Sequence, residues 1–430
     1  MELKPGYKQT EVGVIPEDWD VTSLGSVSEL TSGTTPSRTL MDRYFKNGSI
    51  AWVKTLDLNN SDIWKTEECV TNLALQETCL RVNKIGTVLV AMYGGFNQIG
   101  RTGLLRIPAA VNQAITAIYP TKGVLVSEYL INNLNYRIDY WKQVASSSRK
   151  DPNITSKDIR AVPIACPKIN EQRAIAEALS DADALIESLE QLIAKKRKIK
   201  QGSMQELLTG KKRLPGFIGE WEVKSLGDLF SFSGGYSASR DQLSSEGHCY
   251  LHYGDIHGAS KMFVDTKSDY HNIPKLNIPL KRILPHFLLK DGDVVFVDAS
   301  EDEEGTSKYV VVVNKDNRPF IAGLHTIVSK SKTDELHHEY RRYCFQTVAI
   351  RQQFLFYAVG TKVSGISKLN IPKMKIPVPS FPEQTAIAAI LSDMDIEIDA
   401  LEAKLTKARQ LKQGMMHNLL TGKIRLLPSA

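Results

Sequence analysis

Two short segments contain residue types that nucleotide or base chemistry would use. The run from Gly95 to Thr102 follows a strand-like segment and nearly has the spacing of a phosphate-binding loop. It carries Arg101 where that loop requires a lysine, and residues 103–108 do not begin the helix whose N-terminus would hold the phosphate. Residues 151–154 (DPNI) share two residues with a motif that holds a flipped base, but lack its second proline and its stacking aromatic. Neither segment predicts a catalytic site, and we interpret the second as a turn.

One group of side chains has the composition of a metal site. His248, Cys249, His252 and His257 are close in sequence, but zinc sites usually place two ligand pairs at fixed spacings. The stretch between His252 and His257 is strand-like, so surface or core histidines are the favoured interpretation. The sequence has no Gly-x-Ser-x-Gly motif for a nucleophilic serine. We therefore expect neither a metal site nor a catalytic residue in this chain.

Charge and loop composition are compatible with a polyanionic partner. The chain of 430 residues has a net charge of +6 and a pI of about 8.8. Lys and Arg contact phosphates, whereas Arg, Lys, Asn and Gln read base edges, so such residues in loops are candidates for DNA contact. Each could equally be an ordinary solvated loop residue. The candidates are Arg38, Lys54, Asn97, Gln98, Arg101, Ser148, Arg149 and Lys150 in the first half of the chain, and Arg240, Lys261, Lys308, His325, Thr361 and Lys362 in the second.

The candidate residues lie in two bodies that are framed by an internal repeat. Residues 171–214 and 383–426 align without a gap, with 25 of 44 positions identical. A shorter opening motif precedes each copy, WDVTSLG at residues 19–25 and WEVKSLG at residues 221–227. The bodies between these segments, about 28–150 and 230–360, barely resemble each other. The chain therefore consists of two tandem units with similar connecting parts and different bodies.

Both long repeats are predicted to be helices. Apolar residues recur in steps of three and four between good helix formers, which is the heptad pattern of a coiled coil. Glu171 and Glu383 fall in the first turn, where the helix dipole favours acids, and Gly210 and Gly422 mark the C-terminal ends. Each helix would have about 35 residues and a length of about 50 Å.

An isolated helix must bury such an apolar stripe, so we expect the two helices to pair. The long body between them favours an antiparallel pair. The alternative is that each helix packs only on its own body. The residues predicted to pair the helices are Ile175, Leu179, Ile186, Leu189 and Ile193 in the first, and Ile387, Leu391, Ile398, Leu401 and Leu405 in the second.

The two bodies are predicted to be rich in β-structure. Residues 87–93, 293–297 and 309–313 are strand-like runs, whereas residues 128–143 and 334–353 have helical patterns. The expected fold is α+β, with two β-rich domains separated by two long antiparallel helices in a pseudo-twofold tandem repeat. We place the domains at 1–165 and 215–377, and the helical segments at 166–214 and 378–430.

Cysteine usage and hydropathy indicate where the chain would work. Its five cysteines form no CxxC pair and no disulfide framework, which favours a reducing compartment. No run approaches the ~20 apolar residues of a membrane helix, and residues 1–20 lack a secretory signal core. We expect a cytoplasmic protein that does not associate with membranes.

Several motifs resemble those of specificity subunits of Type I restriction–modification systems. The run from Glu11 to Trp19 is similar to the opening of that family. Residues 32–37, 50–58, 90–100 and 111–115 look like one target recognition domain of the family, and residues 253–256, 292–293 and 322–327 look like another branch of it. The Glu-Gln start and the Leu-Leu-Thr-Gly-Lys end of both helices match its conserved regions. The resemblance covers nearly the whole chain.

The resemblance implies a non-catalytic, sequence-specific DNA-binding subunit. Each target recognition domain would read one half of a bipartite asymmetric site in double-stranded DNA, and the helices would set the spacing and dock two methyltransferase subunits. Motor-nuclease subunits would complete the complex. No cofactor is expected on this chain, whereas S-adenosylmethionine, ATP and Mg²⁺ are expected on the partner subunits. The alternative function is a coiled-coil scaffold that bridges two protein- or glycan-binding domains.

Overall fold

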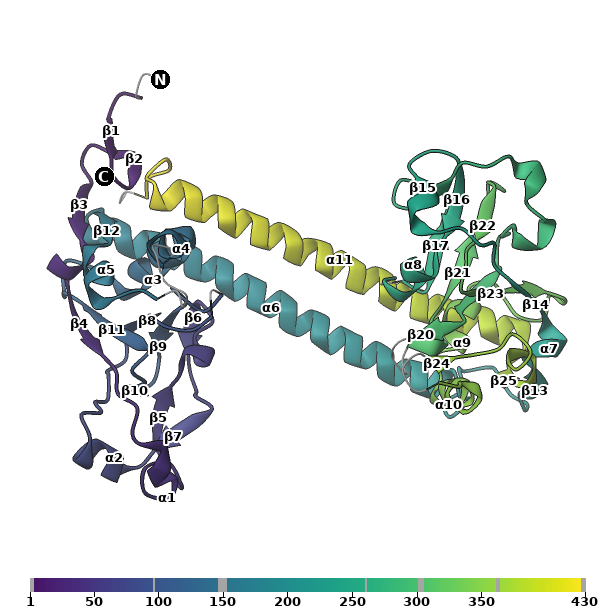
Figure 1. Cartoon of the computed structure of the whole chain (residues 1–430), viewed down its shortest axis with the longest axis horizontal. Helices are drawn as coiled ribbons and strands as arrows, with labels where there is room; N and C mark the ends of the chain where they lie inside the picture. The colour runs from purple at the N-terminus through teal and green to yellow at the C-terminus, as the bar shows by residue number, and fades with distance from the viewer. Residues whose placement is uncertain are drawn as a thin grey trace. The chain divides into compact units, whose positions relative to one another are not determined.

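The computed structural model describes residues 4–95, 97–145, 153–259, 261–300, 305–360 and 364–426. The chain divides into two units: unit 1 comprises Met1–Glu190 and Ala403–Ala430, and unit 2 comprises Gln191–Glu402. Each unit combines one β-rich body with part of each long helix, α6 (Ile169–Leu207) and α11 (Phe381–Leu420) (Figure 1). Among the described residues, no helix is both long enough and apolar enough to cross a membrane.

The body of unit 1 is built on a five-stranded sheet of order β4-β11-β8-β9-β6, in which only β6 and β9 pair in parallel. A second sheet has the order β10-β5-β7, and β1–β2 and β3–β12 form two-stranded pairs. The strands are β1 (Tyr7–Thr10), β2 (Gly13–Pro16), β3 (Asp20–Ser23), β4 (Ser28–Ser32), β5 (Ile50–Val53), β6 (Ser61–Ile63), β7 (Glu68–Val70), β8 (Val88–Ala91), β9 (Thr102–Leu105), β10 (Ala110–Val111), β11 (Ile115–Pro120) and β12 (Pro163–Cys166). The shorter helices are α1 (Met41–Tyr44), α2 (Asn72–Glu77), α3 (Ser127–Tyr136), α4 (Ile138–Ala145) and α5 (Ser156–Ala161).

The body of unit 2 repeats this topology. Its five-stranded sheet has the order β14-β23-β19-β21-β17, again with the last pair parallel, and β16 pairs in parallel with β22 as β5 does with β10. The strands are β13 (Glu222–Ser225), β14 (Phe230–Gly234), β15 (Leu243–Ser244), β16 (His248–Leu251), β17 (Phe263–Asp265), β18 (Lys275–Leu276), β19 (Val294–Val297), β20 (Ala299–Ser300), β21 (Tyr309–Val313), β22 (Phe320–Ala322), β23 (Thr326–Ser331), β24 (Ser364–Gly365) and β25 (Lys375–Val378). The shorter helices are α7 (Leu226–Leu229), α8 (Tyr253–His257), α9 (Arg341–Cys344) and α10 (Val348–Tyr357).

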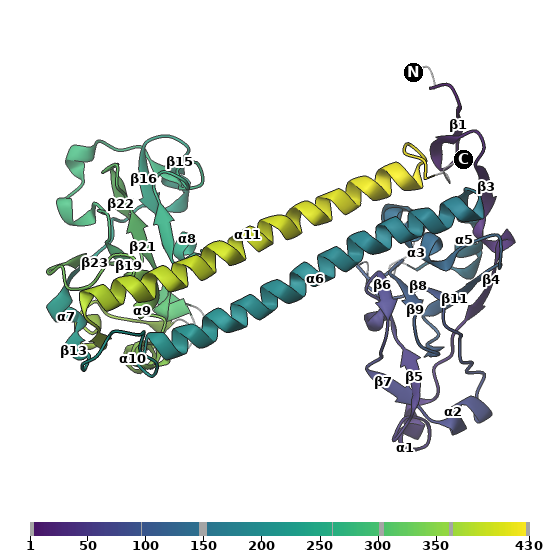
Figure 2. The same ribbon diagram turned by 180° about the vertical axis from the view of Figure 1, so that it is seen from behind.

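The core of each unit joins the body to both long helices. In unit 1, Ile175 and Leu179 of α6 lie in one apolar cluster with body residues and with Leu419 and Leu420 from the end of α11. In unit 2 the roles are exchanged, and the start of α11 shares a cluster with Leu207 and Leu208 at the end of α6. Within each unit the beginning of one helix therefore packs with the end of the other, which confirms the antiparallel pairing (Figure 2).

Ion pairs between the helices follow the same antiparallel register. In unit 1, Lys412 pairs with Asp183 at 2.5 Å and Arg409 pairs with Glu190 at 2.6 Å. The corresponding repeat residues make the corresponding pairs in unit 2, where Lys200 pairs with Asp395, and Arg197 pairs with Glu402 at 2.6 Å. Because at least one side chain of every pair is more than a third exposed, each pair contributes at most about 1 kcal/mol and serves mainly to set the register.

A buried glutamine attaches the start of each long helix to its body. The amide nitrogen of Gln172 donates to the carbonyl oxygens of Val124 and Pro167, each at 2.9 Å, and its amide oxygen accepts from the backbone N–H of Val126 at 2.9 Å. The matching residue in unit 2 makes the same three kinds of bond. Gln384 donates to the carbonyls of Glu335 and Pro379 and accepts from the N–H of His337.

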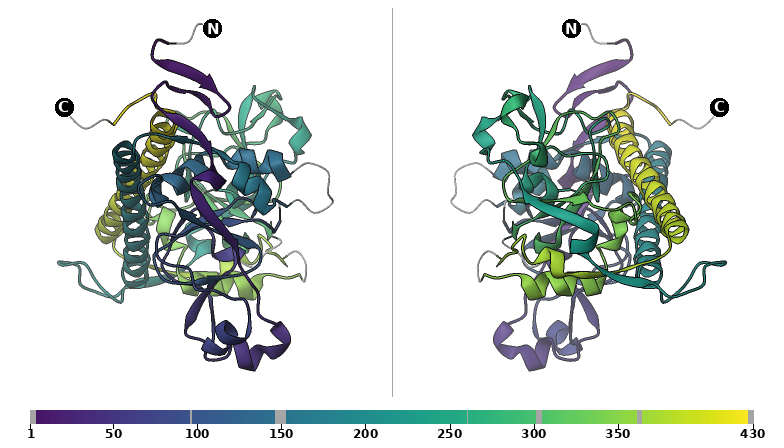
Figure 3. Two further views of the ribbon diagram at one scale, coloured as in Figure 1. Left: turned by 90° about the vertical axis from the view of Figure 1, so that its left-hand side faces the viewer. Right: turned by 90° about the vertical axis from the view of Figure 1, so that its right-hand side faces the viewer.

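The opening motif is fixed to the helix by a buried carboxylate in both units. Trp19 Nε1 donates to Glu171 at 3.1 Å, and Trp221 Nε1 donates to Glu383 at 3.1 Å. In unit 1 the hairpin β1–β2 adds a contact, because the hydroxyl of Tyr7 donates to the carbonyl of Gly422 at 2.9 Å. Figure 3 shows this hairpin, in purple, next to the yellow C-terminal end of α11.

The predicted strands at 87–93, 293–297 and 309–313 are confirmed as β8, β19 and β21, but two predicted helices are wrong in extent. Residues 128–143 form two helices, because Arg137 leaves helical geometry and its guanidinium donates to the carbonyl of Pro163. Residues 334–353 contain α9 and the start of α10, which Thr347 caps by accepting from the N–H of Ile350. In both places a local side-chain bond to the backbone overrides the apolar pattern.

Candidate nucleic-acid interface

In both bodies, the same kind of hydrogen bond stabilises the turn that follows a strand. In unit 1, β5 leads into a 3-10 turn (Thr55–Asp57), and the backbone N–H of Lys54 donates to the Asp57 carboxylate at 2.7 Å. In unit 2, β16 leads into α8, and the N–H of His252 donates to the Asp255 carboxylate at 3.2 Å. Lys54 and His252 therefore occupy matched places in the two bodies.

A second pair of matched places follows β8 and β19. The backbone N–H of Met92 donates to the carbonyl of Ala114 at 2.7 Å, and the N–H of Asp298 donates to the carbonyl of His325 at 3.2 Å. The carbonyls of Met92 and Asp298 accept in turn from Ile154 and Ile366, which are equivalent residues of the repeat. Met92 thus matches Asp298, and Ala114 matches His325.

A glycine fixes a third matched place. A Cβ on Gly33 would lie 2.1 Å from the carbonyl oxygen of Asn112, and a Cβ on Gly235 would lie 1.8 Å from that of Gly323. Only glycine permits this close backbone approach. Each glycine begins a loop that leads to a short 3-10 turn, whose first residue is Arg38 in unit 1 and Arg240 in unit 2. We call these shared hydrogen bonds and glycine contacts the recognition frame.

In unit 1 the recognition frame brings two of the predicted DNA-binding residues together. Glu68 pairs with Arg38 at 2.8 Å and with Lys54 at 2.9 Å, and Lys54 also pairs with Glu67 at 3.0 Å. The hydrogen bond from Arg38 is the main reason that the pKa of Glu68 is lowered, and the bond to Glu68 raises the pKa of Lys54. The Arg38 guanidinium also lies 4.4 Å from the centre of the Phe45 ring. The two cations are therefore held in fixed positions beside acids that partly neutralise them.

The turn after β8 holds three further predicted residues. Asn97 is exposed, whereas Gln98 and Arg101 are half-buried. The side chain of Gln98 packs against the backbone of Gly94, where an added Cβ would lie 2.4 Å from Gln98 Oε1. Arg101 Nε donates to the carbonyl of Asn97 at 2.9 Å. Of the three, Asn97 is the residue whose side chain is presented to solvent.

In unit 2 the recognition frame gathers aromatic and imidazole rings. The ring of Tyr253 has its centre 4.5 Å from that of His252, 5.5 Å from that of His325 and 6.1 Å from that of His257. His325 Nδ1 lies 3.3 Å from a carboxylate oxygen of Asp298. His325 also has a left-handed backbone, with φ of 58°. Strained conformations of this kind are typical of functional sites.

Charged groups surround this ring cluster. Burial, followed by the charge of Arg240, lowers the pKa of His252, and burial raises the pKa of Asp298. Lys308 donates to the carbonyl of His257 at 2.8 Å. Arg240, Lys308 and His325, which were predicted from scattered parts of the sequence, therefore lie around one site.

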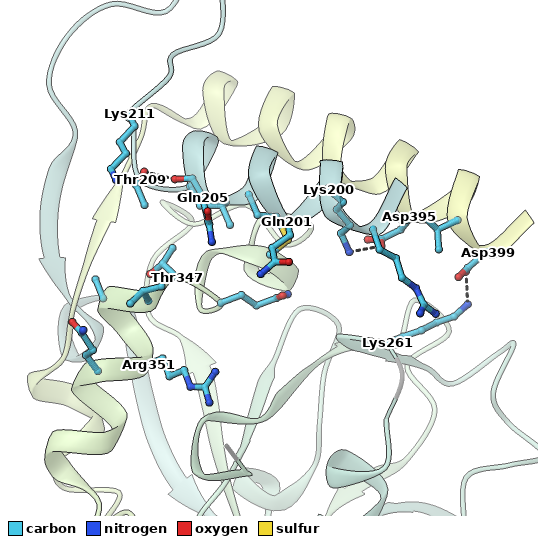
Figure 4. Close-up of a pocket in the computed structure, with 18 of the residues that line it drawn as sticks. Lys200, Gln201, Gln205, Thr209, Lys211, Lys261, Thr347, Arg351, Asp395 and Asp399 are labelled. Atoms are coloured by element: carbon cyan, nitrogen blue, oxygen red, sulfur yellow. Dashed lines mark hydrogen bonds and ion pairs between the residues drawn. The ribbon is translucent and has the colours of Figure 1, made fainter. Parts of the chain in front are cut away.

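Lys261 lines a groove of unit 2, which has a volume of about 1100 Å³ and lies between α10 and the two long helices (Figure 4). Its amine pairs with Asp399 of α11 at 3.0 Å, and Lys200 pairs with Asp395 along the same wall. The predicted residues Ser148, Arg149, Lys150, Thr361 and Lys362 lie outside the described residues.

The residues predicted to pair the helices differ in burial. Ile175, Leu179, Ile387 and Leu391 are fully buried in clusters that also contain body residues. Ile193, Ile398 and Leu401 are buried, and Ile186, Leu189 and Leu405 are half-buried. The first turns of each stripe thus pack against the body as well as against the other helix.

Met92, Tyr253 and Asp298 were not among the predicted site residues, and His252 was predicted to be an ordinary surface or core histidine. The available signal was an alignment of residues 50–58 with 248–256, which places Lys54 opposite His252 and Asp57 opposite Asp255. Within the described ranges, no three His, Cys, Asp or Glu side chains are grouped as metal ligands. His252 instead caps α8, where its ring Nδ1 accepts from the N–H of Gly254 at 3.0 Å.

The duplicated frame agrees with comparisons to known proteins. The family model of the Type I restriction modification DNA specificity domain matches residues 16–197 and again residues 218–410. The chain belongs to this family. It is 25% identical over 449 aligned positions to the Type I restriction enzyme MjaIX specificity subunit of Methanocaldococcus jannaschii, covering 98% of this chain and 96% of that protein. It is 26% identical over 442 positions to the MjaVIII specificity subunit of the same organism, covering 96% and 94%.

Solved structures of specificity subunits share the fold. The crystal structure of the S subunit of a Type I restriction–modification system from M. genitalium has a TM-score of 0.58 at 15% sequence identity, covering 97% of this chain and 98% of that one. The predicted fold class, α+β with two β-rich domains and two long antiparallel helices, is therefore confirmed. The matches support the interpretation as a DNA specificity subunit and do not support the scaffold alternative.

Proposed function

We propose that this specificity subunit is non-catalytic and that each of its units reads one half of a bipartite, asymmetric site in double-stranded DNA. The observation that carries the proposal is the duplicated recognition frame with different side chains at matched places. A common backbone presents Lys54, Met92 and Ala114 in one unit, and His252, Asp298 and His325 in the other. Because base edges are distinguished by hydrogen-bond and apolar contacts, such a pair of sites would select different bases.

The proposed protein partners are two methyltransferase subunits, with motor-nuclease subunits in the full complex. The repeat supports two methyltransferase subunits, because each unit has its own copy of the paired helix segments, with the Lys412–Asp183 ion pair in unit 1 and the Lys200–Asp395 ion pair in unit 2. Two equivalent surfaces would bind two copies of one partner. S-adenosylmethionine, ATP and Mg²⁺ would be held by these partners, and the complex would work in the cytoplasm.

The long helices would set the spacing between the half-sites. Each of them belongs in part to unit 1 and in part to unit 2, so a change in helix length would alter the distance between bases read without altering the bases themselves. A heptad-sized deletion within residues 180–200 provides the test. A changed base sequence in either half-site would contradict this role.

The decisive experiment is a genome-wide map of N6-methyladenine in the host with and without the gene. Loss of methylation at one split, asymmetric motif is the expected result. A complementing chain in which residues 28–150 come from another family member should restore a motif that is new in one half only. If both halves changed, or if no motif were lost while the subunits were expressed, the proposed function would be wrong.

A further inference from the structure

The matched places of the recognition frame differ most in chemistry at one pair. Unit 1 has Met92 and Ala114, a thioether and a methyl group, and Met92 is buried. Unit 2 has Asp298 and His325 at the same two places, with the imidazole Nδ1 3.3 Å from the carboxylate. An apolar pair in unit 1 is thus replaced by an acid–imidazole pair in unit 2.

The histidines of the chain are distributed unevenly between the two units. Eight of the nine histidines of the chain lie in unit 2, whereas the ninth, His417, lies on α11 within unit 1, where its ring contacts the hydroxyl of Tyr136 at 2.8 Å. Histidine is the side chain whose charge ordinarily changes between pH 5 and 8. Proton-dependent changes in that range are therefore concentrated in unit 2.

His325 is placed so that its charge can act on a bound ligand. Half of its side-chain surface is exposed, and about a third of that of Asp298 is. The groups that face the pair are Tyr253 and His252 from the β16–α8 segment, and beyond them Arg240 and the Lys308–His257 bond. Asp255, which accepts from the His252 N–H, is a second carboxylate beside this cluster, whereas Arg240 and Lys308 are the basic side chains around it that would attract an anionic ligand such as a DNA backbone.

We propose that Asp298 and His325 are the specificity-determining pair of unit 2, and that they make recognition of one half-site dependent on pH while recognition of the other is not. This inference rests on the proposed function and specifies which residues carry it. A carboxylate and an imidazole can bond to the polar edges of a G·C pair, whereas at the matched places of unit 1 Met92 is buried in the core and Ala114 has only a methyl group to offer, as to a thymine methyl group.

The direction of the pH effect follows from the charges. When His325 is protonated, the imidazolium compensates Asp298 and attracts the DNA. When His325 is neutral, the Asp298 carboxylate is uncompensated and repels the phosphates. Affinity for the second half-site should therefore rise as the pH falls, and a single proton limits the change to about tenfold per pH unit.

The test uses the full chain in complex with its methyltransferase subunits and duplexes carrying the mapped site. Affinity is measured at pH 6 and pH 8 at constant ionic strength, with either half-site intact or scrambled. We expect several-fold tighter binding at pH 6 for duplexes that retain the half-site of unit 2, and a ratio near one when only the other half-site is intact. His325→Gln should abolish the ratio, and His325→Ala should also relax the base preference at positions of that half-site alone.

The control is His271→Ala, an exposed histidine in the same body, which should leave both the ratio and the preference unchanged. If the pH ratio survives in His325→Gln, or if His325→Ala alters the preference in the other half-site, the inference is wrong while the proposed function stands. If no duplex is bound sequence-specifically at any pH, both fail. Circular dichroism of the variants distinguishes loss of the fold from loss of the pair.

Discussion

Arg425 donates two hydrogen bonds, of 2.7 and 2.9 Å, to the carboxylate of Glu171, which lies 254 residues earlier in the chain. Glu171 is buried and also accepts the bond from Trp19, while Arg425 makes a second bidentate contact with Asp18. The bonds from Arg425 lower the pKa of Asp18, and the bonds to Glu171 and Asp18 raise the pKa of Arg425. The carboxylate therefore connects the start of α6, the opening motif and the segment after α11 within unit 1.

Glu171→Gln should destabilise unit 1 by about 1–3 kcal/mol, because a neutral amide replaces the buried carboxylate that accepts from Arg425 and Trp19, and charge compensation of Arg425 is left to the more exposed Asp18. Glu383→Gln should have the matching effect on unit 2, where Arg213 and Trp221 bind the same carboxylate. Urea unfolding combined with hydrogen exchange of each unit measures the change. Exposed Glu177→Gln on the same helix is the control, with an expected change below about 0.5 kcal/mol. An equal loss in the control would refute the special role of the buried acid.

Gly422→Ala should cost more stability than Gly210→Ala, although both glycines end equivalent helices. Both have a left-handed backbone, with φ of 68° and 69°, so alanine costs about 1 kcal/mol at either position. At Gly422 the added Cβ would also lie 2.4 Å from Pro16, whereas at Gly210 the nearest atom is 3.5 Å away in Trp221. Overpacking adds about 1–3 kcal/mol at the first site. Thermal unfolding of the two variants gives the comparison, and equal losses would show that the contact with Pro16 is easily relieved.

Arg38→Ala and Arg240→Ala should each weaken binding to one half-site only. Removal of a base or phosphate contact typically costs about 1–3 kcal/mol. Fluorescence anisotropy with duplexes carrying one scrambled half-site measures the effect, and Arg240→Ala should make no further difference once its own half-site is scrambled. Exposed Arg282→Ala in the same body serves as the control. Loss of affinity for both half-sites from either change would argue against independent readers.

Asp293 should make the stability of unit 2 depend on pH. Burial raises its pKa above the ordinary 3.8, against the opposing bonds from the Lys290 N–H and the Lys330 amine. The folded state therefore binds this proton more tightly than the unfolded state, so the contribution of Asp293 to stability falls as the pH rises above 3.8. Asp293→Asn should show a smaller fall than the wild type in urea unfolding at pH 4 to 7. A variant with the same slope would show that another group is responsible.

The parts of the molecule that repeat could be predicted from the sequence, because duplication and heptad spacing both leave visible patterns. The two long helices and their glycine ends follow from residues 171–214 and 383–426, and strands such as β21 follow from β-branched runs. Only part of the recognition frame leaves such a pattern, in the shared Asp57 and Asp255 and the shared Gly33 and Gly235. The bonds of the frame that join Met92 to Ala114 and Asp298 to His325 run through backbone atoms, which impose no common side chain. For the same reason, the grouping of Arg240 with Lys308 and His325 became visible only in three dimensions.

The attachment of each long helix through Gln172 or Gln384 has an evolutionary consequence. Within the described part of the chain, both glutamine side chains bond only to main-chain carbonyl and N–H groups, so these bonds depend on the path of the neighbouring chain and not on its side chains. A gene segment that encodes a foreign body with the same backbone path would need no compensating substitutions at these glutamines, provided that its apolar residues still pack on the start of the helix. Recombination at the borders of the bodies can therefore supply new recognition sequences in a single step, whereas point mutations would have to build them residue by residue.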